Sequence, residues 1–310
     1  MFIKARAVVV GLISLAALIL LNGPAKAQTT LKYKFKEGEK LNYVLEINQK
    51  QTINVMGNEI ETGTTQTMDM TWTVKEAKGG KAQVVQSVDR LRMKVDSAFG
   101  GFEFDSKDGK EPEGQIGMLI GPVLNAMAKA EFIVTMTEQG EITETKLSEK
   151  LIEAIKSNPL LQQMGGSFSE EGMKNLMGQQ GGAVLSKDAV KKGETWNTKS
   201  EAKTPPLGLT KLNNTYTYQG PEERDGVNVE KVDVKTEMTI EPLDNADVQF
   251  EAKVKSSEVK GTIYFDNKAG RLVGTTTNTK MSMELNAMGN VFDMVQDQTV
   301  TLKLVKPSGD

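Results

Sequence analysis

A strict alternation of apolar and polar residues begins after residue 30 and constrains the fold more than any other feature. The apolar members of its first two runs are Leu31, Tyr33, Phe35, Leu41, Tyr43, Leu45 and Ile47. Successive side chains of a strand point to opposite faces, so a period of two predicts strands with one buried face. Similar runs continue to Leu304, with turn dipeptides such as Gly57-Asn58 and Gly79-Gly80 between them. The pattern predicts long antiparallel strands joined by short turns.

Three segments depart from this alternation. Residues 116–128 and 148–157 place apolar side chains three and four positions apart, which is typical of helices with one buried face. Within residues 82–95 the apolar positions change from even, as in Val88, to odd, as in Leu91, which predicts a β-bulge. We therefore expect an α+β fold, mainly antiparallel β, whose long curved strands carry the two helices on their concave side.

The second half of the chain repeats patterns of the first. Residues 190–196 match residues 35–41 around a shared Lys-x-Gly-Glu motif, and later strand and turn patterns correspond at slightly different offsets. The segment between the copies, residues 158–183, is rich in Gly, Gln, Ser and Met. The sequence therefore predicts two related β-rich halves, residues 28–157 and 184–310, joined by a flexible segment.

The first 27 residues have the three-part layout of a secretory signal. Lys4 and Arg6 precede an uncharged, predominantly apolar run at residues 7–21, and small residues then flank Lys26 up to Ala27. An uncleaved anchor is the alternative, but a run of 15 residues is shorter than the roughly 20 that span a bilayer. We expect cleavage between Ala27 and Gln28 and a periplasmic or secreted product that does not span the membrane.

The composition excludes several kinds of chemistry. The chain contains no cysteine and no histidine, which removes disulfides, thiolate nucleophiles and both Ser-His-Asp and Cys-His catalysis. Because the signal segment takes three of the 38 basic residues and none of the 41 acidic ones, the remaining chain is more acidic than the net charge of −3. No basic stripe is visible, so we expect no nucleic-acid partner. We also expect neither a cofactor nor a metal.

Two short motifs resemble functional sites but lack their context. The acidic loop at residues 105–113 could offer oxygens to calcium, but Lys107 occupies a ligand position of the EF-hand spacing. Ser257 and Lys260 match a Ser-x-x-Lys pattern that operates at a helix start, whereas their surroundings alternate as a strand does. We interpret the first as a solvated loop and the second as chance.

Methionine is the one compositional bias that suggests a ligand. Apart from the initiator there are 15, many at inward positions, and methionine lines adaptable hydrophobic surfaces. One interpretation is a groove, closed by the two helices, that accepts a lipid or a hydrophobic peptide segment. The other is ordinary core filling. The candidate ligand-binding residues are Met68, Met70, Trp72, Met93, Leu119, Met127, Met136, Met281 and Met283.

Three strand-and-turn motifs carry a resemblance to known proteins. They lie at residues 36–43, 190–196 and 265–272, and they resemble a family of exported, β-rich bacterial proteins of unknown function. The strand order is also similar to the periplasmic lipoprotein carriers, which implies a curved antiparallel sheet cupped over helices. This second likeness concerns the fold alone and implies no function.

The leading functional hypothesis is a non-enzymatic module of the bacterial envelope that buries a hydrophobic ligand or partner segment. The alternative is a structural envelope protein without a ligand, whose long hairpins at residues 48–67 and 276–299 pair with neighbouring molecules. A carboxylate-based hydrolase is a more remote alternative, because no pair stands out among the 41 acidic residues.

Overall fold

The computed structural model describes residues 28–55, 57–98, 100–157, 184–204, 208–241, 250–287 and 290–306. The expected signal segment, the expected flexible segment at residues 158–183 and the expected turn at Gly289 lie outside the described residues. Among the described residues, no helix is long and apolar enough to cross a membrane.

The described elements are twelve strands and two helices. The strands are β1 (Lys40–Val55), β2 (Asn58–Lys78), β3 (Lys81–Ser97), β4 (Phe102–Asp105), β5 (Glu131–Thr137), β6 (Ile142–Leu147), β7 (Thr195–Thr204), β8 (Gly208–Arg224), β9 (Val227–Glu241), β10 (Phe250–Asp266), β11 (Arg271–Ala287) and β12 (Asn290–Val305). The helices are α1 (Gly114–Met127) and α2 (Glu149–Ser157). The expected mainly antiparallel β protein with two short helices is confirmed.

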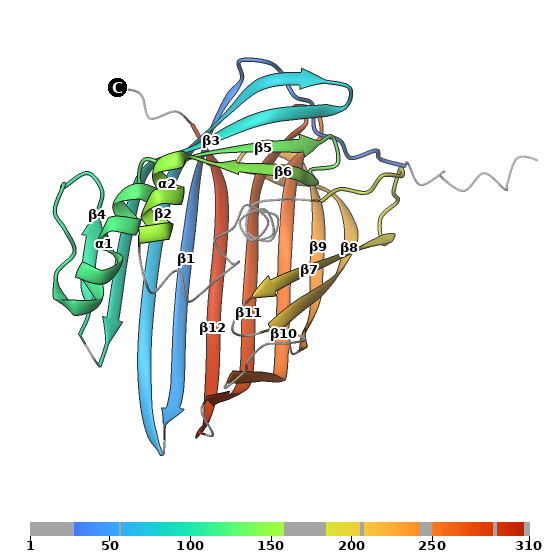
Figure 1. The fold of residues 1–310 in the computed structure, drawn as a ribbon. Coiled ribbons are helices and arrows are strands. Elements are labelled where there is room, and N and C mark those ends of the chain that lie inside the picture. Colours follow the sequence, from blue (N-terminus) through green and yellow to red (C-terminus); the bar gives the residue numbers. More distant parts are fainter. Residues whose placement is uncertain are drawn as a thin grey trace, which may run out of the picture.

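All the strands belong to one antiparallel sheet. Its order is β6-β5-β3-β2-β1-β12-β11-β10-β9-β8-β7, and β4 adds to β3 outside this path. The first strand therefore pairs with the last at the centre, with Tyr43 opposite Leu304 and Asn54 opposite Asp293. Figure 1 shows the sheet curved into a deep half-cylinder, with β5 and β6 across its upper end and β7 and β8 along one side.

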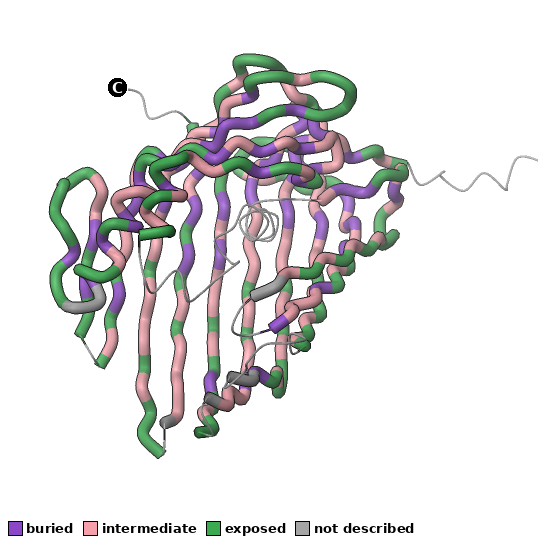
Figure 2. Tube along the Cα trace, viewed as in Figure 1, coloured by how far each residue is buried: buried purple, intermediate pink, exposed green. Residues whose placement is uncertain are grey.

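The core lies at the upper end of the concave face. Tyr43, Trp72 and Phe265 are buried there, and the ring centroids of Tyr43 and Trp72 are 4.5 Å apart. β5 curls over this end and adds Val134 and Met136 from its inward positions. Buried residues accordingly concentrate at this end, whereas the lower parts of the long strands are mostly half-buried (Figure 2).

Residues 28–39, here called the N-terminal strap, cross the upper end and join segments from both halves of the chain. The backbone N–H of Tyr33 donates to the carbonyl of Glu138 at 2.8 Å, in the turn after β5. The backbone N–H of Lys34 donates to the carbonyl of Gly270 at 2.9 Å, in the turn before β11. The strap thus ties two turns that are more than a hundred residues apart.

The predicted bulge in residues 82–95 is confirmed. Asp69 pairs with Arg90 and Met70 with Val88, which leaves Asp89 as the extra residue. The change of the apolar residues from even to odd positions in the sequence therefore corresponds to a shift of register in the sheet.

The helices form where they are expected, but they do not cover the centre of the sheet. Both lie at the end of the sheet next to β3 and β4, where α1 contacts α2, β4 and β3 (Figure 1). Leu124 of α1 and Leu151 of α2 join the core from that side. The expectation that the two helices would close a groove over the long strands is therefore wrong.

Candidate binding face

The concave face of the four central strands carries no charged side chain over most of its length. We consider β1 at residues 41–53, β2 at 60–74, β11 at 275–285 and β12 at 292–304. The register places their inward positions opposite one another, as in the buried set Met68, Leu45 and Leu302. The charged residues within these ranges all fall at outward positions: Glu46, Lys50, Glu61, Asp69, Lys280, Glu284, Asp293, Asp297 and Lys303.

Below the core, the inward side chains become neutral and polar. We call this zone the belt; on the central strands it comprises Gln49, Gln51, Thr62, Thr64, Thr279, Gln296 and Gln298. Its amides bond to one another: Gln298 Nε2 donates to Gln49 Oε1 at 3.1 Å, and Gln49 Nε2 donates to Gln51 Oε1 at 3.2 Å. The belt side chains are half-buried, so they offer hydrogen-bonding groups along the concave face.

The belt continues across the second half of the sheet. Thr236 Oγ1 donates to Asn214 Oδ1 at 2.7 Å, and Asn214 Nδ2 donates to Thr198 Oγ1 at 3.2 Å. These residues lie on β9, β8 and β7. A neutral hydrogen-bonding zone therefore follows the concave face from β2 to the edge of the sheet at β7.

Beyond the belt, towards the free ends of the long hairpins, the inward positions are apolar again. We call this zone the rim band; it comprises Ile53, Ile60, Leu212, Met238, Ile240, Ala252, Val254, Met283, Leu285, Phe292 and Met294. Met283 is only 2 % exposed, whereas Phe292 and Ile53 are half-buried. None of the rim-band residues belongs to the contiguous core cluster of the described residues. The rim band is therefore a second apolar zone.

The candidate residues from the sequence fall into separate groups. Met68, Met70, Trp72 and Met136 are core residues, and Met93 and Met127 pack against that core. Met281 lies at belt level opposite Gln296, and Met283 belongs to the rim band. Leu119, on α1, is 44 % exposed. The structure thus does not gather these side chains into one groove.

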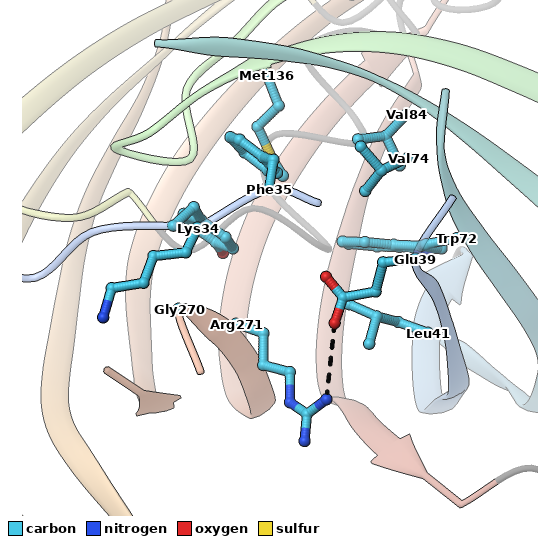
Figure 3. Close-up of a pocket in the computed structure, with 11 residues that line it drawn as sticks. Lys34, Phe35, Glu39, Leu41, Trp72, Val74, Val84, Met136, Gly270 and Arg271 are labelled. Carbon is cyan, nitrogen blue, oxygen red and sulfur yellow. Dashed lines mark ion pairs between the residues drawn. The ribbon is translucent and has the colours of Figure 1, made fainter. Parts of the chain in front are cut away.

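A small pocket lies between the N-terminal strap and the sheet (Figure 3). Phe35, Trp72 and Met136 contribute to its wall, and an ion pair between Glu39 and Arg271, 3.8 Å apart, lies beside it. The cavity volume is about 20 Å³, enough for about one water molecule. The buried Nε1 of Trp72 has no hydrogen-bond partner among the described residues and could donate to such a water. This pocket is too small for an acyl chain.

In the acidic loop at residues 105–113, Asp105 forms an ion pair with Arg90 of β3. The Arg90 guanidinium donates two hydrogen bonds to the Asp105 carboxylate. Nε donates to Oδ1 at 2.9 Å, and Nη2 donates to Oδ2. This hydrogen bonding, helped by the backbone N–H of Lys107, lowers the pKa of Asp105 from 3.8 to about 2. Across the described part of the chain, no three carboxylates come together as a metal site would require.

The Ser-x-x-Lys pattern lies within β10, as the alternation predicts. Ser257 is half-buried opposite Met281, whereas Lys260 is exposed on the convex face and pairs with Glu258. The two side chains lie on opposite faces of the sheet and cannot act together on one substrate.

The edges of the two long hairpins are largely occupied by strands of the same chain. β1 pairs with β12 within this chain from Asn42 to Asn54, while β2 pairs with β3 and β11 with β10. Strand pairing of residues 48–67 and 276–299 with neighbouring molecules would have to use the few positions outside these ladders, such as Asn58–Glu61, and it remains a prediction. The sequence analysis did not single out the rim band, although Ile53, Ile60 and Phe292 continue the inward positions of the core residues on their strands.

The fold and this face together define a mainly antiparallel β protein whose concave face is uncharged along most of the four central strands. The model of a family of unknown function, DUF6263, matches residues 79–272, which is more than half of the sequence. The chain belongs to this family. The match confirms the resemblance to a β-rich family of unknown function. No curated protein matches the sequence significantly.

Solved structures give distant likenesses. A lipovitellin structure described by its lipid–protein interactions has a TM-score of 0.47 and 11 % identity, covering 89 % of this chain and 26 % of that one. An outer membrane channel from Pseudomonas putida F1 has a TM-score of 0.27 and 7 % identity, with 88 % and 97 % covered. A putative lipoprotein-sorting domain from Vibrio parahaemolyticus has a TM-score of 0.17 and 9 % identity, with 87 % of each covered. This chain spans about a quarter of the lipovitellin chain. At these TM-scores, the likenesses carry no functional argument.

Proposed function

We propose that this protein is a non-enzymatic binding module of the bacterial envelope whose concave face holds a hydrophobic ligand against the rim band. One observation carries the proposal: the rim band is apolar, separate from the core, and only half-buried at Ile53, Ile60, Leu285 and Phe292. A soluble sheet needs one apolar zone to build its core, and this one carries a second zone across seven strands from β2 to β8.

The energetic argument rests on the half-buried members of the rim band. Ile53, Ile60, Leu285 and Phe292 all face inward and remain partly accessible. Covering apolar surface stabilises a complex by about 25 cal/mol per Å². Contiguous apolar patches on a protein surface typically mark places where something binds. The rim band is therefore the best-supported docking surface among the described residues.

The envelope location follows from the signal-like first 27 residues, with Gln28 as the expected new N-terminus. The first described hydrogen bond to another part of the chain comes one residue later, where the Thr29 N–H donates to the Val190 carbonyl at 2.8 Å. Removal of residues 1–27 would leave the whole N-terminal strap in place.

The proposal also includes a duplicated architecture, supported by matching hydrogen bonds. Gly38 N–H donates to the Val74 carbonyl at 2.9 Å, and Gly193 N–H donates to the Tyr218 carbonyl at 2.7 Å. A register shift directly follows Val74 on β2, and another directly follows Tyr218 on β8. Each half then runs as an antiparallel meander, and both progress across the sheet in the same direction. These correspondences favour two related halves.

Further register shifts occur at matching places in the fourth strand of each meander, β5 in the first half and β10 in the second. In the first half, a shift separates Thr135 and Met136 on β5. In the second half, a shift separates Tyr264 and Phe265 on β10. Because bulges arise at specific positions, two matched pairs support common ancestry of the halves better than sequence patterns alone.

The test is native mass spectrometry of residues 28–310 purified gently from a bacterial periplasm, followed by solvent extraction. A reproducible mass excess that extracts as lipid supports the proposal. The variant Phe292→Gln should lose most of this excess. Its matched control is Val291→Gln on the same strand, where Val291 is 58 % exposed at an outward position.

Two outcomes would contradict the proposal. One is a clean apo mass together with no binding of a hydrophobic dye. The other is an equal loss of ligand in Phe292→Gln and Val291→Gln, which would assign the ligand to some other surface. Circular dichroism of both variants shows whether each has kept the fold.

A further inference from the structure

Resting on the proposed function, we infer that the ligand is a monomeric lipid whose head is uncharged but forms hydrogen bonds. Its acyl chain lies along the rim band and its head lies at the belt. The class includes lipids with free hydroxyl or ester groups, such as acylglycerols.

The first argument is the absence of any counter-charge. Over residues 41–53, 60–74, 275–285 and 292–304, every inward position is occupied by an apolar or a neutral polar residue. The acids and bases of these strands point outward, where most of them form ion pairs, as Lys50 does with Glu61 at 3.4 Å. A charged head drawn onto the concave face would lose its hydration without gaining a partner, which is strongly unfavourable.

The second argument is the chemistry of the belt. One row of paired residues crosses eight strands: Thr64, Gln49, Gln298, Thr279, Val259, Thr236, Asn214 and Thr198. All but Val259 carry a hydroxyl or a primary amide. Each such group can both donate and accept, so the row satisfies hydroxyl and carbonyl oxygens equally well. A neutral head with hydroxyl and ester groups has the matching chemistry.

The third argument is dimension. The half-buried members of the rim band, Ile60, Ile53, Phe292 and Leu285, lie on the four adjacent strands β2, β1, β12 and β11. At about 4.8 Å between strands, these four strands span roughly 14 Å. One leaflet of a bilayer's hydrocarbon core is about 15 Å thick, so the span is close to the length of an extended acyl chain. Ile53 lies two residues from Gln51, which puts the belt about 7 Å away.

The experiment compares three probes that share one oleyl chain and differ only in the charge of the head: monooleoylglycerol, oleate and oleylamine. Each displaces the uncharged dye N-phenyl-1-naphthylamine from residues 28–310 at pH 7.5. We expect monooleoylglycerol to displace the dye at a concentration at least about tenfold lower than either charged probe, equivalent to about 1.4 kcal/mol.

A charge placed on the belt tests its location. Gln49→Lys should improve displacement by oleate roughly tenfold and weaken displacement by oleylamine. Asn48→Lys is the matched control, because Asn48 is the neighbouring residue and is exposed on the convex face. This control should leave the order of the three probes as it is in the unmodified protein.

The outcomes separate the two proposals. If none of the probes displaces the dye, or the dye does not bind, the proposed function fails and this inference fails with it. If all three displace it equally well, hydrophobic binding stands and selection for a neutral head is overturned. If Gln49→Lys and Asn48→Lys alter the order of probes alike, the belt is not where the head lies.

Discussion

Lys34 and Gly270 meet backbone to backbone, with the Lys34 N–H donating to the Gly270 carbonyl over 2.9 Å. Gly270 has a φ of +71°, a conformation that glycine adopts without a steric cost. A β-carbon at this position would lie 2.5 Å from the Lys34 nitrogen. The turn before β11 is therefore shaped both by its own backbone and by the N-terminal strap above it.

Gly270→Ala should lower the free energy of unfolding by several kcal/mol, because it adds a clash with the strap to a backbone strain of about 1–2 kcal/mol. The control is Gly57→Ala, at a φ of +84° with nothing within 4 Å of the added carbon. Urea denaturation of both variants measures the difference. Equal losses would mean that the strap moves aside without cost.

The hydroxyl of Tyr43 ties the first strand to the start of β11. It donates to the Leu272 carbonyl at 2.9 Å, and Tyr43 is only 1 % exposed. Tyr43→Phe should therefore cost about 1–2 kcal/mol of unfolding free energy, since a buried carbonyl loses a partner. Tyr264→Phe is the control, because the ring under the Arg224 guanidinium remains in place there. Urea denaturation measures both variants. If Tyr43→Phe lowers the free energy of unfolding no more than Tyr264→Phe does, the hydrogen bond from Tyr43 to Leu272 does not stabilise the fold.

Acid should weaken the protein partly through Asp105. Its pKa is lowered from 3.8 to about 2 by Arg90, so its contribution is present above about pH 4 and is lost as the pH falls towards 2. Asp105→Asn should be less stable than the unmodified protein at pH 5, and the gap should close near pH 2. Urea midpoints at three pH values measure it. Asp96→Asn is the control, because Asp96 belongs to an exposed ion pair, and its urea midpoint should stay close to that of the unmodified protein at every pH. If the difference in midpoint between Asp105→Asn and the unmodified protein is the same at every pH, the assignment to Asp105 is refuted.

Alkali should act on Tyr218, whose hydroxyl donates to the Glu230 carboxylate and lies 3.3 Å from Thr29 Oγ1. Burial, followed by the bond to Glu230, raises the pKa of Tyr218 from 10.0 to about 12. Its contribution is therefore complete below pH 10 and is lost as the pH rises through 12. Tyr218→Phe should be destabilised at pH 8, with a gap that narrows above pH 10. Urea denaturation of both proteins at pH 8 and pH 11.5 measures this difference in stability. If the difference is the same at both pH values, the assignment to Tyr218 is contradicted.

Local patterns in the sequence predicted the local structure well. The alternation located the strands, the helices began within two residues of their expected starts, and the parity change between Val88 and Leu91 located a real bulge. Each of these features depends on residues that are neighbours in the sequence, so a window of ten or fifteen residues contains the whole signal.

The arrangement of the strands could not be predicted in the same way. Nothing local to residues 42–54 specifies that they pair with residues 293–305, because many alternating strands would fit there equally well. The candidate site shared this difficulty. Met68 and Met283 both occupy inward positions of their strands, yet only Met68 belongs to the contiguous core cluster, and the sequence pattern does not distinguish the two.

The pairing of β1 with β12 sets an order of events for a newly made chain. During synthesis, β1 can find β2 at once, but its other edge has no partner until residues 290–305 have emerged. The central seam would thus be the last part of the sheet to close. If the protein is exported unfolded and N-terminus first, as we propose from its signal-like segment, the complete sheet can form only when nearly the whole chain is on the far side of the membrane.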